Sequence, residues 1–266
     1  STWDNDDSAI FNPGTGIVFI DAGGVTASSL LFNETATIAG GLLTLSGTGS
    51  IDAAEGTVAA IESPISGSAG MLVGSQSAGT IILAGANDFT GVTTVQGGAW
   101  LGVESATALG STTGGTVVEA GSTLALGPVS VVGESLQLAG EGVSNSGGAL
   151  YVNNPSSTSS FTGNISADSD SRIGSAGNLT LGGLISLNTA ELTLNATPTG
   201  AITLNEVSSI SGGPNASGSA LNLTGGGAIT LNGSNSYTGA TSITGGTRVA
   251  VTSATALPSA TGRTGL

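Results

Sequence analysis

The 266-residue chain contains no cysteine, no histidine and no lysine, and its only basic residues are three arginines. Without cysteine, disulfide bonds and thiolate metal sites are excluded. Without histidine or lysine, the usual nucleophile–base pairs of enzymes are missing as well. Charged residues make up 8% of the chain, whereas about 25% is ordinary for a globular protein. We therefore expect a protein that is not an enzyme.

Long hydrophobic runs are also missing. The longest, Ile17–Ile20 and Thr80–Ala84, have the length of a strand, whereas a helix that spans a membrane needs about 18 apolar residues. We expect no direct membrane insertion by this segment. The mean hydropathy of +0.34 argues against disorder. The 46 glycines argue against helices, because glycine weakens a helix interior. The composition predicts an all-β chain.

The balance of charge is strongly acidic. Seventeen acidic residues against three basic ones give a formal net charge of −14. Such a surface repels nucleic acid and anionic membranes, so we expect neither as a partner. It permits cationic partners and divalent cations without requiring them.

An internal repeat is the most informative feature of the sequence. Residues 87–111 read NDFTGVTTVQGGAWLGVESATALGS and residues 235–259 read NSYTGATSITGGTRVAVTSATALPS. Gly85 corresponds to Gly233, which sets an offset of 148 residues (233 − 85). A match of this length predicts that a whole structural unit was duplicated, the second copy being incomplete.

Short segments of alternating apolar and polar residues recur along the chain. Alternation at period two places leucine and isoleucine on one face of a strand and threonine, serine or asparagine on the other. Many short strands that stop at glycine, asparagine or proline favour a solenoid over a sandwich. We expect residues 1–266 to form a single solenoid with roughly 20 residues per turn. Examples of these segments are LLTLSG (42–47), LTLGG (179–183), LTLNA (192–196) and AITLNG (228–233).

The repeat is specific enough to resemble a known family. GTIILAGANDFTGVTTVQGGAWLGVESATALG (79–110) and GAITLNGSNSYTGATSITGGTRVAV (227–251) resemble the autotransporter-associated β-strand repeat, also called the passenger-associated transport repeat. The two copies of the repeat depart from the family pattern at Ala99-Trp100, Thr247-Arg248 and Pro258. The resemblance implies a right-handed parallel β-helix in an exported passenger region of a bacterial surface protein. It implies no catalytic activity and carries no catalytic residues onto this chain.

Two acidic groups are candidate Ca²⁺ sites, because carboxylate oxygens are the ligands that this ion prefers. Asp4, Asp6 and Asp7 form the densest acidic run, and Asp168 and Asp170 precede Arg172. If the second segment is extended, its two aspartates and the arginine share a face, which resembles the metal and base of a β-helical polysaccharide lyase. The alternative is a surface turn with one local ion pair. We expect no other cofactor.

The favoured function is that of a non-enzymatic structural protein at the bacterial cell surface or in the extracellular matrix. In this interpretation a rigid β-helix serves as a stalk, a fibre or an adhesin passenger with a surface or matrix ligand. The alternative is a β-helical carbohydrate-active enzyme of the lyase type. The repeat pattern stops in mid-course near Leu266. Two explanations are a fragment of a longer solenoid, and a neighbouring subunit that completes the last turn in a head-to-tail filament.

Overall fold

The structure is a computed structural model, and it describes residues 6–14, 16–74, 79–144, 146–206, 208–213, 219–258 and 264–265. All regular structure in these ranges is β-strand, so the described chain offers no helix that is long and apolar enough to cross a membrane. The chain divides into two compact units, Ser1–Leu124 and Ala125–Leu266. Each unit contains one copy of the repeat and is described by itself. The single solenoid over residues 1–266 stays a prediction.

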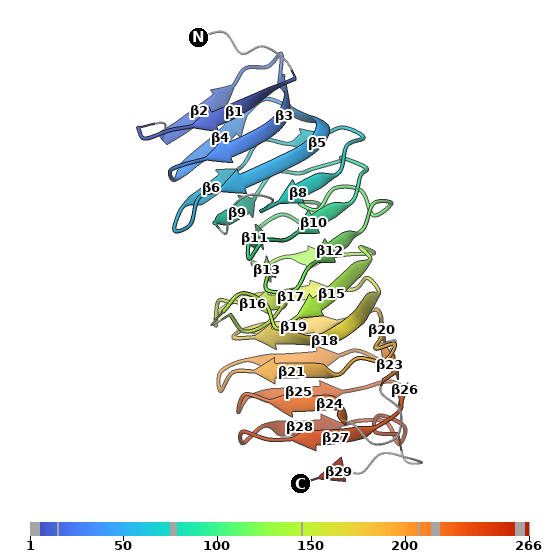
Figure 1. Cartoon of the computed structure of the whole chain (residues 1–266). Coiled ribbons are helices and arrows are strands. Elements are labelled where there is room, and N and C mark those ends of the chain that lie inside the picture. The colour runs from blue at the N-terminus through green and yellow to red at the C-terminus, as the bar shows by residue number, and fades with distance from the viewer. Residues whose placement is uncertain are drawn as a thin grey trace. The chain divides into compact units, whose positions relative to one another are not determined.

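Unit 1 is built from short parallel strands that stack on one another (Figure 1). One stack runs β2–β4–β6–β9–β11, and a second runs β1–β3–β5–β8–β10–β12. The pairing of β7 with the start of β5 marks a third face. The strands are β1 (Asp7–Phe11), β2 (Gly16–Ile20), β3 (Val25–Phe32), β4 (Ala36–Gly40), β5 (Leu43–Ala53), β6 (Val58–Ile61), β7 (Ile65–Ser66), β8 (Met71–Val73), β9 (Thr80–Leu83), β10 (Thr93–Val95), β11 (Trp100–Val103) and β12 (Thr116–Val118), with β13 (Thr123–Leu126) at the division.

Unit 2 has three such stacks. They run β14–β17–β19–β22–β25–β28, then β15–β18–β20–β23–β26, then β16–β18–β21–β24–β27–β29. The long strand β18 belongs to two stacks because it turns a corner between Ala167 and Ser171. The strands are β14 (Ser130–Val131), β15 (Leu136–Gly140), β16 (Leu150–Val152), β17 (Thr158–Phe161), β18 (Ile165–Ser175), β19 (Asn178–Leu181), β20 (Leu184–Ser186), β21 (Leu192–Ala196), β22 (Ala201–Leu204), β23 (Ser209–Gly212), β24 (Ser219–Thr224), β25 (Ala228–Leu231), β26 (Ser236–Tyr237), β27 (Ala240–Ile243), β28 (Arg248–Val251) and β29 (Thr264–Gly265).

The core of each unit is a set of apolar ladders. In unit 2, Phe161 lies against Leu181, Leu181 against Leu204 and Leu204 against Leu231, and all four are at most 1% exposed. Their neighbours Thr180, Thr203 and Thr230 point outward and are partly exposed, as period-two alternation requires. The expected all-β parallel solenoid is therefore confirmed. One turn takes about 20 to 30 residues, within the repeat lengths of solenoids.

The Gly-Gly pair of each repeat forms a tight turn before a strand. Gly97 and Gly98 precede β11 with φ of 64° and 81°, and Gly245 and Gly246 precede β28 with φ of 68° and 76°. These left-handed conformations strain any residue with a side chain. The backbone path thus requires two glycines at this turn, and the two copies adopt the same conformations there.

Candidate functional site

A buried asparagine joins three successive turns of the solenoid in the first repeat. Asn87 is 5% exposed. Its Oδ1 accepts a hydrogen bond from the backbone N–H of Ile65, 22 residues earlier, at 2.8 Å. Its Nδ2 donates to the carbonyl oxygen of Ala108, 21 residues later, at 2.6 Å. One side chain thus satisfies backbone groups in the turn before and the turn after its own, and we call this arrangement the asparagine clamp.

The second repeat contains the same clamp. Asn235 is 6% exposed. Its Oδ1 accepts from the N–H of Ile210 at 2.8 Å, and its Nδ2 donates to the carbonyl oxygen of Ala256 at 2.6 Å. In both copies the clamp asparagine also donates its backbone N–H, to Thr107 in the first and to Thr255 in the second. The role is therefore fixed by the motif and not by one local environment.

An aromatic residue stands two positions after each clamp asparagine, and here the two copies differ. Phe89 is fully buried, and Tyr237 is 2% exposed. The Tyr237 hydroxyl shares a 2.6 Å hydrogen bond with Thr241 Oγ1. At the equivalent place in the first repeat, the buried Thr93 Oγ1 has no hydrogen-bond partner among the described residues, because phenylalanine has no hydroxyl. Burial raises the pKa of Tyr237 above its ordinary value, and the bond to Thr241 opposes that shift.

Glycine opens each motif because the chain passes very close to the preceding turn. A Cβ on Gly85 would collide with the carbonyl oxygen of Ser63, and a Cβ on Gly233 would collide with that of Ser208. Ser63 and Ser208 each lie two residues before the amide that the clamp binds. Close approach of the two turns and the clamp bond between them are parts of one arrangement.

Residues 76–99 and 221–247 match the family model of the passenger-associated transport repeat. The chain carries two passenger-associated transport repeats. The matched segments contain Asn87, Phe89 and Thr93 in the first copy, and Asn235, Tyr237 and Thr241 in the second. Neither the curated proteins nor the solved structures contain a match to this chain.

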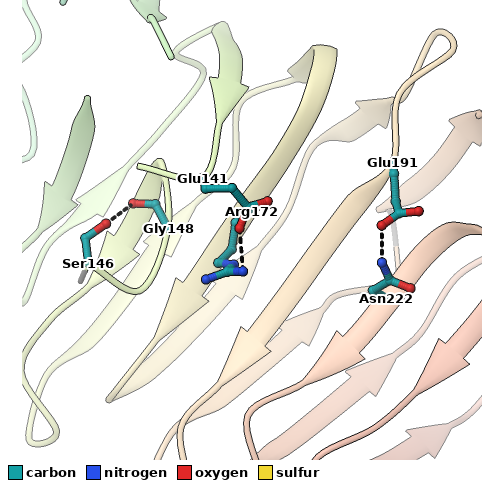
Figure 2. A network of polar contacts seen from close by, with 6 residues as sticks. All are labelled: Glu141, Ser146, Gly148, Arg172, Glu191 and Asn222. Carbon is teal, nitrogen blue, oxygen red and sulfur yellow. Dashed lines mark hydrogen bonds and ion pairs between the residues drawn. The ribbon is translucent and has the colours of Figure 1, made fainter. Parts of the chain in front are cut away.

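A second polar grouping is an acidic corner on unit 2. It consists of Glu141 after β15, Asp170 and Arg172 on β18, Glu191 before β21 and Asn222 on β24. Arg172 forms an ion pair with Glu141, and Asn222 Nδ2 donates to Glu191 Oε1, as Figure 2 shows. Asp170 Oδ1 accepts from the backbone N–H of Glu191 at 2.9 Å. Each acid therefore already has a partner within the protein.

The surroundings of the acidic corner shift the pKa of Glu191. Burial raises the pKa of its carboxyl above the ordinary value of 4.5, and the negative charges of Asp170 and Glu141 raise it further. The hydrogen bond from Asn222 acts in the opposite direction. The fold thus disfavours the ionised form of Glu191.

The residues of the proposed lyase-like site all lie on β18 and have different partners. Asp168 accepts hydrogen bonds from Gln137, Ser166 and Asn188. Arg172 forms its ion pair with Glu141 through a terminal guanidinium nitrogen. The buried Nε of Arg172 has no hydrogen-bond partner in the described part of the chain. The alternative was a surface turn with one local ion pair. The segment lies in strand β18 instead, and the ion pair of Arg172 is with Glu141 and not with one of the aspartates.

The candidate Ca²⁺ ligands are placed as follows. Asp4 lies outside the described residues. Asp6 is exposed with φ of 70° and donates its backbone N–H to Thr26, and Asp7 is exposed at the start of β1. In the ranges that the structure describes, no group of three or more acidic side chains is arranged to hold a metal ion. Both Ca²⁺ sites stay predictions.

The sequence interpretation missed the clamp and the acidic corner. The asparagine is identical in the two copies of the sequence. Its partners, however, lie 21 to 25 residues away, and they bond to it through backbone groups that the sequence does not mark. Glu191 and Asn222 are 31 residues apart. Only an accurate count of the residues in each turn would have brought either set together.

Proposed function

We propose that the chain is a non-enzymatic structural segment of a surface-exposed bacterial passenger, in which the two clamped repeats stiffen a stalk or fibre. The passenger-type assignment follows from the repeats and the parallel solenoid. The finer role rests on one observation. In both copies a buried asparagine side chain is bonded on both sides to backbone groups of neighbouring turns, so the repeat employs it to hold the turns together.

The chemistry of the surface supports the same proposal. In unit 2, Asp168, Asp170 and Glu191 all accept hydrogen bonds from donors within the protein. Absence of lysine and the presence of only three arginines leave little for trypsin-like proteases to cleave. A stiff, protease-resistant segment suits a location outside the cell.

The proposal is tested by display on cells. The chain is placed between a signal peptide and an outer-membrane translocator in a Gram-negative host, and intact cells are treated with a broad-specificity protease. We expect the chain at the surface as a core that resists digestion until the cells are heated. Retention inside the cells, or immediate digestion at the surface, would refute the proposal.

The lyase-type alternative has its own assay. If Arg172 acted as a base, incubation with acidic polysaccharides would generate unsaturated uronic acid ends that absorb in the ultraviolet. We expect no such product from the wild-type chain with or without Ca²⁺. A product that disappears in the Arg172→Ala variant would establish the enzyme reading instead.

A further inference from the structure

The sequence contains a single Asn-Gly step, at Asn232-Gly233. The step follows β25 directly and precedes the clamp residue Asn235 of the second repeat. At the corresponding place the first repeat has Ala84 before Gly85, so the motif requires the glycine and not the asparagine. The fold of the repeat therefore does not explain why an asparagine stands here.

The backbone nitrogen of Gly233 is available as a nucleophile. In the part of the chain that the structure describes, its N–H has no hydrogen-bond partner, whereas the N–H of Gly85 donates to the carbonyl oxygen of Ile61 at 3.2 Å. Glycine has no side chain to hinder the approach of its nitrogen to the side chain before it. Asn232 and Gly233 are both partly exposed, so water has access to the step.

The side-chain amide of Asn232 is arranged as the electrophile. The hydroxyl of Thr252 donates a hydrogen bond to Asn232 Oδ1. Negative charge develops on that oxygen when a nucleophile adds to Cγ, and a donor placed there stabilises the charge. The attacking nitrogen belongs to the next residue of the same chain, so the reaction has the advantage of an intramolecular step.

We infer that Asn232 is a site of spontaneous deamidation. The nitrogen of Gly233 forms a bond to Asn232 Cγ, the bond from Cγ to Nδ2 breaks, and the proton of the attacking nitrogen passes through water to the ammonia that leaves. A five-membered succinimide ring remains. Water then opens the ring at one of its two carbonyl carbons, which gives aspartate or isoaspartate. Nothing is oxidised or reduced, and water is the only co-reactant.

The isoaspartate product would loosen the clamp of the second repeat. Its main chain runs through Cβ and Cγ, so it is one atom longer than before. Gly233 has no room for this change, because a Cβ on it would already collide with the carbonyl oxygen of Ser208. The displaced segment leads to Asn235, whose Oδ1 accepts from the N–H of Ile210. The first repeat has no Asn-Gly step and keeps its clamp, so the modification acts as an irreversible timer in one repeat.

The chain provides its own control for the chemistry. The segments 201–205 and 228–232 both read AITLN, and their strands pair in register, but Asn205 is followed by Glu206. The full chain is incubated in mildly alkaline buffer and sampled by peptide mapping with mass spectrometry, and isoaspartate is detected with an isoaspartyl methyltransferase. We expect Asn232 to convert at least about tenfold faster than Asn205. No conversion at Asn232, or equal rates at the two asparagines, would overturn the inference.

Two variants and one further measurement test the mechanism and its consequence. Asn232→Ala restores the residue of the first repeat and should fold normally without forming the product, and Thr252→Val should slow the conversion several-fold. In aged wild-type protein, amide hydrogen exchange should accelerate at Ile210 and stay unchanged at Ile65, and aged Asn232→Ala should show neither change. Conversion at the wild-type rate in Thr252→Val would overturn the role of that hydroxyl. Unchanged exchange at Ile210 in fully converted protein would overturn the loosening of the clamp.

Discussion

At the scale of single residues, two buried asparagines hold neighbouring turns of the solenoid together. Buried polar groups are costly unless they are hydrogen-bonded, and a clamp asparagine satisfies two backbone groups that would otherwise lie unpaired between turns. The identity of Asn87 and Asn235 in the two copies follows from this geometry, because no other side chain of that length offers both a donor and an acceptor in one plane.

Removal of either clamp should weaken its unit. Asn87→Ala and Asn235→Ala each leave one backbone N–H and one carbonyl oxygen buried without partners, so we expect a loss of about 2–5 kcal/mol in the free energy of unfolding. Denaturant titration measures this loss. The exposed Asn153→Ala is the matched control and should change the free energy by less than about 0.5 kcal/mol. Equal effects of clamp and control variants would contradict the assignment.

The aromatic residue two positions after each clamp asparagine gives a reciprocal pair of predictions. Phe89→Tyr supplies the hydroxyl that Thr93 lacks and should stabilise the protein by about 1 kcal/mol. Tyr237→Phe removes the partner of Thr241 and should destabilise it by about 1–3 kcal/mol. Both are read from the midpoint of denaturant unfolding at constant slope. Destabilisation by Phe89→Tyr would show that the first repeat has no space for the hydroxyl.

At the scale of elements, each strand has one side in the core and one side in solvent. The alternation in the sequence was sufficient to predict this for AITL at 228–231, because period two is a property of the strand itself. The sequence alone did not predict which strands pair with each other, because the segments between successive strands differ in length. The same limit hid the acidic corner, whose members come from successive turns.

Adjacent residues of β22 test the alternation. Leu204 is fully buried in the ladder between Leu181 and Leu231, so Leu204→Ala should cost about 2–5 kcal/mol. Thr203, its outward neighbour, should tolerate alanine within about 0.5 kcal/mol. Thermal or denaturant unfolding of the two variants measures the difference. A larger effect at Thr203 would mean that β22 places Thr203 in the core and Leu204 in solvent.

The acidic corner predicts a dependence of stability on pH. Because the pKa of Glu191 is raised in the folded state, its contribution favours folding below pH 4.5 and is lost as the pH rises through the folded pKa. Glu191→Gln keeps an acceptor for Asn222 and removes the charge, so it should be more stable than the wild type at pH 7. That advantage should vanish below pH 4.5. The exposed Glu104→Gln is the control, and a constant advantage at every pH would contradict the prediction.

At the scale of the whole molecule, self-association is the prediction that the sequence raises most directly. In the described residues β2 is paired along one edge only, with β4, and its side chains Ile17 and Phe19 are 60% and 73% exposed. A free strand edge with apolar side chains invites pairing with another chain. Head-to-tail assembly is therefore expected to depend on this strand.

Negative-stain microscopy across a Ca²⁺ titration tests the assembly. We expect filaments from the wild-type chain and their loss in Phe19→Lys, which introduces a charge beside the free edge. Val132→Lys is the matched control, because Val132 is 65% exposed in unit 2. Isolated particles under all conditions, or filaments that persist in Phe19→Lys, would exclude assembly through β2.

Each passenger-associated transport repeat is held by an asparagine bonded to the turns before and after it. Amide hydrogen exchange resolved by residue tests it most directly, since the N–H groups of Ile65 and Ile210 donate to Asn87 and Asn235. The account predicts slow exchange at both amides, with Asn87→Ala accelerating Ile65 and sparing Ile210, and Asn235→Ala doing the reverse. Fast exchange of these amides in the wild type, or no response to either substitution, would contradict it.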